Sequence, residues 1–387
     1  MGEKADQAPP SLAKGSLKPS ILSLQVSIPK RRIQTRSTRL WLSQGRLFLR
    51  CAELILSPST SLKVNSAQGS DGRFFSPAFD ALPFFSLSSL QMSSPRKTSP
   101  HPSPRARRIG IHLSTTGGVA KAVEHAPEIG ANTLQIFSAS PRMWRASKIS
   151  AAQAEQTRAA RARLDVGPLV IHTSYLVNVC SQTEEVRQKS ILAFRGEIER
   201  ALALGAEYLV LHPGSYRGMT REQGLALAAE SIAQAIDGLP WQGTAFHILI
   251  ENTAGAEFSL GGSFDQVAEL IARLRPHAPV GACLDTCHTH VAGYDLVSES
   301  GYQETMRQVE QTIGAETVRV WHCNDAKAAR GSKLDRHEHI GQGTIGIEPF
   351  RRLLNDPEFA HAAFIAETPV DVPGDEERNV RALLALL

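Results

Sequence analysis

The chain has 387 residues, of which 42% are hydrophobic, and its 42 basic and 38 acidic residues give a net charge of +4. This length and apolar content are sufficient for one large domain or two medium-sized ones. No run of about 18 uncharged apolar residues is present, which excludes a membrane-spanning helix. Five cysteines without a C-x-x-C pair exclude a disulfide framework and indicate reduced thiols in an intracellular compartment.

The net charge averages over two different kinds of sequence. Residues 1–108 contain 17 Lys and Arg, 5 Asp and Glu, 20 serines and 11 of the 22 prolines, whereas the remainder has 25 basic and 33 acidic residues. This composition predicts that residues 1–107 form a low-complexity, disordered extension to one domain at 108–387. The extension could be a targeting peptide, a basic arm for nucleic acid, or a segment outside the working protein, if translation starts at Met92. We favour the third interpretation, or a dispensable tail.

From about residue 107, short apolar runs alternate with longer amphipathic stretches. Apolar residues at helical spacing predict helices over 187–204, 224–236 and 264–274. Eight strand–helix units in about 280 residues predict a (β/α)8 TIM barrel. A doubly wound open sheet is the alternative, but the turn at 114–118 lacks the glycine-rich phosphate-binding pattern of that fold. The predicted strands are 108–113, 133–138, 169–173, 208–211, 247–251, 280–285, 318–322 and 363–367.

Six successive predicted strands end in side chains that can bind a metal ion. In a barrel, these strand ends meet in a ring at the C-terminal mouth, where active sites of this fold lie. A single histidine or aspartate at a strand end is most often a capping or hydrogen-bonding residue, but six in register would leave buried charges unpaired. Divalent cations resolve this conflict, so we predict a metal site at the mouth. Its candidate residues are His172, His212, Glu251, Asp285, His288, His322, Asp325 and Glu367.

The types of side chain favour Zn²⁺, with Mn²⁺ or Fe²⁺ as alternatives, because imidazole and carboxylate groups are present together. Cys283 and Cys287 flank Asp285 and are interpreted as core packing. In the long loop after the seventh strand, Asp335 and His337 lie two residues apart, so an extended backbone places both on one side. Together with His288, they could form a further metal site.

The motifs that carry these residues are HTSYLVN, HPGS, ENTAG, LDTCH with AGYD, HCNDAK, LDRHE and ETP, in this order. They resemble the endonuclease IV family of apurinic/apyrimidinic DNA repair nucleases, over about residues 108–387. The resemblance implies three zinc ions per chain in a TIM barrel. The first ion would be held by His172, His212 and Glu251, the second by Glu251, Asp285, His322 and Glu367, and the third by His288, Asp335 and His337.

The resemblance also implies a reaction. It is hydrolysis of the phosphodiester 5′ to an abasic site, leaving a 3′-hydroxyl and a 5′-deoxyribose phosphate, together with the clearing of blocked 3′ ends in base excision repair. Glu251, Asp285 and Glu367 would be the catalytic carboxylates, with Glu251 bridging two cations and Glu367 orienting or deprotonating the nucleophile. The alternative is a metal-dependent sugar isomerase or epimerase on the same barrel, with one or two metal ions.

Double-stranded DNA is the partner that the resemblance implies. Arg142, Tyr175 and Leu176 match family positions that wedge into the duplex and stabilise an everted abasic nucleotide. Because residues 109–387 carry a net charge of −8, the attraction to DNA is expected to come from basic loops. We expect a monomer without membrane association, in the bacterial cytoplasm, or in an organelle or the nucleus of a eukaryote. His290 departs from the family pattern and is interpreted as an exposed histidine.

Overall fold

The computed structural model of the chain describes residues 41–43, 46–48, 107–144 and 148–387. In the first two ranges, β1 (Trp41–Ser43) and β2 (Arg46–Phe48) form an antiparallel pair, where no element is predicted from the sequence. The rest of the proposed extension, including Met92, lies outside the described residues, so the disordered tail and its start site stay predictions.

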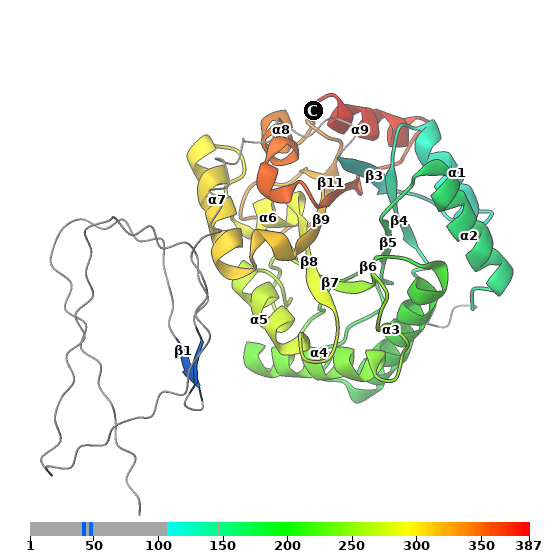
Figure 1. Ribbon diagram of the computed structural model, residues 1–387. Helices are drawn as coiled ribbons and strands as arrows, with labels where there is room; N and C mark the ends of the chain where they lie inside the picture. Colours follow the sequence, from blue (N-terminus) through cyan, green and yellow to red (C-terminus); the bar gives the residue numbers. More distant parts are fainter. Residues whose placement is uncertain (1–40, 44–45, 49–106, 145–147) are drawn as a thin grey trace, which may run out of the picture. The chain divides into compact units, whose positions relative to one another are not determined.

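Eight parallel strands close into a barrel, which confirms the TIM barrel over the doubly wound alternative (Figure 1). The last strand, β12, closes the barrel by pairing with β3 on one side and β9 on the other. The observed strands agree with the predicted ones to within one residue at each end. They are β3 (Arg108–His112), β4 (Thr133–Phe137), β5 (Leu169–His172), β6 (Tyr208–Leu211), β7 (His247–Glu251), β8 (Val280–Asp285), β9 (Val318–His322) and β12 (Ala363–Ala366).

Helices surround the barrel strands (Figure 1). The predicted helix at 264–274 is confirmed. Helices α3 and α4 begin three residues earlier than predicted, because their first turns start with charged residues and so lack apolar residues at helical spacing. None of the helices in the described part of the chain is long and apolar enough to cross a membrane. The helices are α1 (Val119–Glu128), α2 (Ala151–Leu164), α3 (Glu184–Leu204), α4 (Arg221–Ile236), α5 (Phe264–Leu274), α6 (Thr286–Ala292), α7 (Glu299–Thr312), α8 (Ile347–Asn355) and α9 (Asp375–Leu384).

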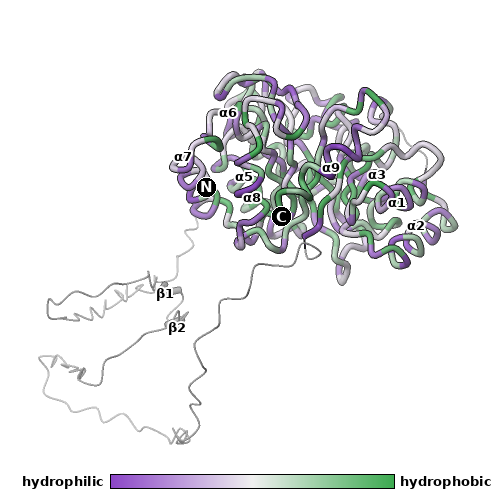
Figure 2. Tube along the Cα trace, turned by 90° about the horizontal axis from the view of Figure 1, so that it is seen from above, coloured by the Kyte–Doolittle hydropathy of each residue, from purple (hydrophilic) through white to green (hydrophobic). Residues whose placement is uncertain are grey.

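Two apolar layers fill the fold. The larger lies between strands and helices and includes the buried rings of Phe194, Phe264 and Trp321. Hydrophilic segments lie at the periphery, for example along α7 (Figure 2). The smaller layer fills the inside of the barrel and closes it below the mouth, so that a site at the mouth has a packed floor. This interior cluster consists of Val170, Val210, Leu249, Cys283, Val320, Ala363 and Ile365.

Candidate metal centre at the barrel mouth

The predicted ligands on the strands share one position relative to the barrel interior. Each lies two residues beyond a member of the interior cluster, as His172 does beyond Val170. Because side chains alternate along a strand, each such residue points toward the barrel axis one layer higher. The same spacing holds for His212, Glu251, Asp285, His322 and Glu367.

The first group of side chains joins His172, His212 and Glu251. Glu251 Oε2 lies 2.9 Å from His212 Nε2 and 3.1 Å from His172 Nε2. Glu251 and His172 are buried, whereas His212 is partly exposed at the mouth. The possible ligand atoms of the three residues lie within 4.8 Å of one another, which is close enough for one metal ion to contact all of them.

The second group shares Glu251 with the first. The other carboxylate oxygen, Glu251 Oε1, lies 2.9 Å from His322 Nδ1, and Glu367 Oε2 lies 3.2 Å from the same nitrogen. Asp285 Oδ2 completes the group at 4.0 Å from His322 Nδ1. A carboxylate whose two oxygens face two ligand groups has the geometry to bridge two cations.

The third group combines His288, from α6, with Asp335 and His337, from the long loop after β9. Asp335 Oδ2 lies 3.1 Å from His288 Nε2, and Asp335 Oδ1 lies 3.2 Å from His337 Nε2. The loop returns to the mouth because β10 (Asp325–Ala326) pairs antiparallel with β11 (His337–Glu338). The structure thus brings together the side chains of all three predicted groups, and their binding of metal stays a prediction.

Four of the histidines hold one ring nitrogen in a hydrogen bond to a carbonyl or amide oxygen. Such oxygens only accept, so the bonded nitrogen carries the proton and the other nitrogen is free to act as a ligand. In His322 the bonded nitrogen is Nε2, which donates to Gln135 Oε1 at 2.8 Å and turns Nδ1 toward the carboxylates. In the other three it is Nδ1, in the pairs His172–Thr173 (2.8 Å), His288–Asn252 (2.9 Å) and His337–Glu367 (3.0 Å).

Three amide side chains that are not predicted from the sequence fix Glu367 and Asp285. Gln135 Nε2 donates to Glu367 Oε1 at 2.5 Å, and Asn324 Nδ2 donates to Asp285 Oδ2 at 2.5 Å. Asn252 Oδ1 accepts a hydrogen bond from the backbone nitrogen of Asp285 at 2.7 Å. Both asparagines lie within two residues of a predicted ligand, and Gln135 interrupts an apolar strand. These positions are the signals that could have revealed them.

Burial and mutual pairing set the ionisation of the site. Burial lowers the pKa of His172, but the hydrogen bond and charge of Glu251 outweigh it and raise this pKa to about 9. For His337, neighbouring carboxylates likewise outweigh burial and raise the pKa to about 9. Burial raises the pKa of Glu367, but the charges of nearby histidines outweigh it and lower this pKa to about 2. The positive charge of protonated imidazoles therefore balances the negative charge of the carboxylates. Bound divalent cations would supply this positive charge in their place.

His337 shows that the site fits a cation. In the neutral ring Nδ1 donates to Glu367 O, so the buried Nε2 faces the carboxylate oxygen Asp335 Oδ1 at 3.2 Å with a lone pair and finds no donor among the described residues. A buried ring nitrogen without a partner is costly, and a metal ion would use its lone pair. Together with the imidazole and carboxylate donors around it, this nitrogen fits Zn²⁺ or another divalent cation that prefers such ligands.

The two cysteines beside Asp285 pack in the core, as predicted. Cys283 belongs to the interior cluster and Cys287 to the layer between strands and helices. Their sulfur atoms lie within 4.8 Å of possible ligand atoms of the second and third groups. Burial raises the pKa of both thiols, which disfavours the thiolate that a metal ion requires.

Two sequence-based interpretations are wrong. Asp325 does not join the ring of ligands, because its carboxylate accepts hydrogen bonds from four backbone nitrogens within its own loop, at Ala326, Gly343, Ile345 and Gly346. His290 is not exposed: only 3% of it is accessible. The loop after β9 covers it, with Thr344 Oγ1 at 3.3 Å from His290 Nε2. Neither result was accessible from strand spacing, because both depend on how this loop folds back.

The predicted DNA-contacting residues lie on two adjacent loops at the rim. Arg142 follows β4 and is exposed, whereas Tyr175 and Leu176 follow β5. The Tyr175 side chain is 75% exposed, and its ring contacts Phe137 at 5.3 Å between centroids. Ser174 Oγ donates to Pro141 O at 2.6 Å, which ties the two loops together. Of the three predicted residues, Tyr175 lines the mouth cavity, and Arg142 and Leu176 lie on the two loops that are joined beside it.

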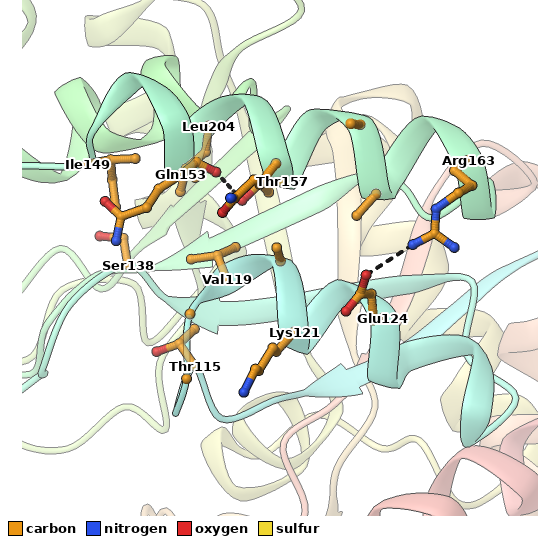
Figure 3. A pocket seen from close by; sticks show the side chains of 16 residues that line it. Thr115, Val119, Lys121, Glu124, Ser138, Ile149, Gln153, Thr157, Arg163 and Leu204 are labelled. Atoms are coloured by element: carbon orange, nitrogen blue, oxygen red, sulfur yellow. Dashed lines mark hydrogen bonds and ion pairs between the residues drawn. The ribbon is translucent and has the colours of Figure 1, made fainter.

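Two cavities differ in what lines them. The mouth cavity, of about 380 Å³, is lined by members of all three ligand groups together with His112, Phe137, Tyr175, Thr368 and Val370. A cavity of about 740 Å³ lies between α1 and α2, and the described residues that line it include no predicted ligand (Figure 3). Of its charged residues, Glu124 and Arg163 pair with each other at 3.0 Å. We therefore place the chemistry in the mouth cavity.

Comparisons with known proteins identify the family of this chain. Residues 123–387 match the family described as xylose isomerase-like TIM barrel. The chain is 50% identical over 282 residues to a probable endonuclease 4 of Solibacter usitatus, covering 72% of this chain and 96% of that protein. Endonuclease IV from Thermus thermophilus has a similar structure, with a TM-score of 0.65 and 37% identity over 72% of this chain and 98% of that one.

Sugar-modifying enzymes share the architecture alone. A D-tagatose 3-epimerase-like protein has a TM-score of 0.52 with 20% identity, over 72% of this chain and 94% of that one. At this identity the similarity shows the fold, so the sugar isomerase alternative has no support beyond the barrel itself. The identity to probable endonuclease 4 and the coverage of that protein are decisive, and the chain belongs to the endonuclease IV family.

Proposed function

We propose that this chain is a zinc-dependent DNA repair endonuclease that hydrolyses the phosphodiester 5′ to abasic sites and clears blocked 3′ ends. As a member of the endonuclease IV family, it is a hydrolase that cleaves DNA. The observation that carries the finer proposal is the convergence of nine imidazole and carboxylate side chains into three groups, two of which share Glu251. Such an arrangement suits a multinuclear phosphodiesterase.

The three groups would each hold one zinc ion. Bound cations would supply Lewis-acid stabilisation of the phosphoryl group and lower the pKa of the attacking water. The ligand sets are His172, His212 and Glu251; Glu251, Asp285, His322 and Glu367; and His288, Asp335 and His337.

Glu367 is the side chain best placed to handle the attacking water. Its pKa of about 2 keeps it ionised at neutral pH, and Gln135 fixes one carboxylate oxygen by a hydrogen bond of 2.5 Å. An ionised carboxylate in a fixed position can orient a water molecule and accept its proton. Glu251 and Asp285 are fixed in the same way by histidines and amides, so the three proposed catalytic carboxylates enter the reaction without reorganisation.

The rim supports binding of a duplex that is opened at a lesion. Tyr175, Met143, Leu334 and Val370 are exposed apolar side chains in loops at the mouth, where they can pack against unstacked bases. Arg142 adds a positive charge on the same rim for the phosphate backbone. A missing base removes much of the stacking that resists extrusion, so a wedge of this kind selects abasic sites without reading bases. We place the protein, as a monomer, in the compartment that contains the DNA.

Cleavage of a defined duplex tests the proposal. The purified protein, loaded with zinc, is incubated with an end-labelled duplex that contains one tetrahydrofuran abasic analogue. We expect one nick 5′ to the analogue without added magnesium, resistance to brief EDTA treatment, and a new 3′-hydroxyl that a polymerase extends. Failure of the fully metallated protein to nick this duplex would refute the proposal.

A further inference from the structure

One part of the mouth cavity is built from residues outside the three ligand groups. His112 ends β3, Phe137 ends β4, and Thr368 and Val370 follow β12, and all four line the mouth cavity. The rings of His112 and Phe137 lie 4.5 Å apart between centroids. We call these four residues the His112 wall. The wall adjoins Glu367, which precedes Thr368 in the chain.

The amide of Gln135 determines which nitrogen of His112 carries the proton. A carboxylate can only accept, so the Gln135 atom that lies 2.5 Å from Glu367 Oε1 is the amide nitrogen. The same nitrogen lies 3.1 Å from His112 Nδ1, to which its second hydrogen is donated. His112 Nδ1 is therefore an acceptor, and in the neutral ring the proton sits on Nε2.

No described residue hydrogen-bonds His112 Nε2, and 19% of the side chain is exposed. The buried network below the ring thus leaves one N–H donor of His112 without a protein partner. A donor whose ring is fixed from behind is pre-oriented for a ligand in the cavity.

Thr368 carries a second donor group, a hydroxyl, on the same wall. The residue is 5% exposed, and its Oγ1 has no hydrogen-bond partner in the described part of the chain. A buried hydroxyl without a partner costs free energy in the folded protein, whereas an apolar side chain of the same shape would not. Oγ1 itself is enclosed, and a rotation about the Cα–Cβ bond of Thr368 would turn the hydroxyl into the mouth cavity, where a bound ligand would accept its hydrogen bond.

We propose that His112 Nε2 and Thr368 Oγ1 donate hydrogen bonds to the phosphate oxygens of the nucleotide at the cleavage site. Non-bridging phosphate oxygens only accept, so they match a wall that offers two donors beside the metal ligands. The apolar members, Phe137 and Val370, would pack against the adjacent deoxyribose. This inference rests on the proposed function and assigns substrate-contacting roles to residues outside the metal centre.

Four substitutions separate the proposed contact from other roles. His112→Asn keeps an acceptor near the Nδ1 position for Gln135 and removes the Nε2 donor, whereas His112→Gln keeps a donor near Nε2 and removes the acceptor. Thr368→Val removes the hydroxyl at constant shape, and Thr368→Ser keeps it. For each variant, kcat and KM are measured on the tetrahydrofuran duplex, with the Kd for the nicked product duplex, the zinc content and the Tm.

The expected pattern is specific to the donors. His112→Asn and Thr368→Val should each lose roughly tenfold to hundredfold in kcat/KM and bind the nicked duplex more weakly, because a hydrogen bond to a charged oxygen is lost. His112→Gln and Thr368→Ser should stay within a few-fold of wild type. Zinc content should be unchanged in all four, and the Tm of Thr368→Val should equal or exceed that of wild type.

Two results would overturn the inference while leaving the proposed function intact. One is wild-type kcat/KM for His112→Asn and Thr368→Val in a protein that nicks the duplex. The other is a loss confined to His112→Gln together with lower zinc content, which would mean that His112 acts through Gln135 on the metal ligands. A wild-type protein that does not nick the duplex would overturn the proposed function and this inference with it.

Discussion

His322 donates a hydrogen bond from Nε2 to the amide oxygen of Gln135, at a distance of 2.8 Å. The same glutamine donates from its nitrogen to Glu367 at 2.5 Å. One buried side chain thus fixes the ring of one predicted ligand and the carboxylate of another. Outer hydrogen bonds of this kind typically change metal affinity by about tenfold to a hundredfold when they are removed.

Gln135→Leu should therefore weaken zinc binding at the second group and reduce kcat. Leucine has a similar size but neither donates nor accepts, so His322 and Glu367 lose their common partner. The measurement is zinc retention in a titration with a competing chelator, for which we expect roughly tenfold weaker retention of one ion. Gln156→Leu, at an exposed position of α2, is the matched control. Equal retention in both variants would exclude the positioning role.

Glu251→Gln should abolish nicking. The substitution keeps the shape of the side chain but removes the charge that faces His212 on one side and His322 on the other. Two of the three ligand groups lose their shared anion, so we expect bound zinc to fall from about three to about one per chain. Glu257→Gln, at an exposed position, is the control for the loss of one negative charge. Near-normal turnover of Glu251→Gln would contradict the bridging role.

Tyr175→Ala should weaken recognition of the lesion and leave the metal centre intact. The ring is 75% exposed at the rim, so its removal costs little in stability. Loss of one stacking partner should raise KM for the abasic duplex by about tenfold, since such stacking contributes about 1–3 kcal/mol. Zinc content should equal that of wild type. The control is Leu192→Ala, which removes a side chain that is 68% exposed on α3 and should leave KM unchanged. The same KM in both variants would show that Tyr175 is not part of the proposed DNA interface.

His125 should make stability depend on pH away from the site. It pairs with Glu128 of its own helix α1 at 2.9 Å and with Glu376 of α9 at 3.1 Å, and the bond to Glu128 is the largest cause that raises its pKa above 6.5. The stabilisation is therefore fully present below pH 6.5 and lost as the pH rises through the folded-state pKa. Because the side chain is 43% exposed, we expect about 0.5 kcal/mol.

The corresponding test compares melting curves at two pH values. His125→Asn should lower Tm by about 1–2 °C at pH 5.5 and leave it unchanged at pH 9. The exposed His277→Asn serves as control. A Tm difference that is the same at both pH values would show that the imidazolium pairs do not contribute.

The barrel and the convergence of the ligand groups could be predicted because both follow from local regularities. Strand–helix units of similar length place strand ends on one rim, and alternation along a strand decides which side chains face inward. His172 and Glu251 are 79 residues apart, yet each lies two residues beyond an interior side chain, and they meet at 3.1 Å. The spacing of these residues along the chain is therefore sufficient to predict that their side chains meet.

The hydrogen bonds around the ligands could not be predicted in the same way. Gln135 contacts His322 of β9 and Glu367, which follows β12, and neither of these strands pairs with β4 in the barrel. Asp325 and His290 depend on the path of the loop after β9, which has no periodic pattern. The roles of Asp325 and His290 follow from tertiary contacts that patterns in a single sequence do not contain.

Metal analysis tests the central claim most directly. The purified protein, dialysed against metal-free buffer, is analysed by inductively coupled plasma mass spectrometry together with quantitative amino-acid analysis. The three ligand groups predict about three zinc ions per chain. If the protein holds only one or two ions per chain after loading with excess zinc, this result would contradict a centre with three metal ions and would favour the isomerase alternative.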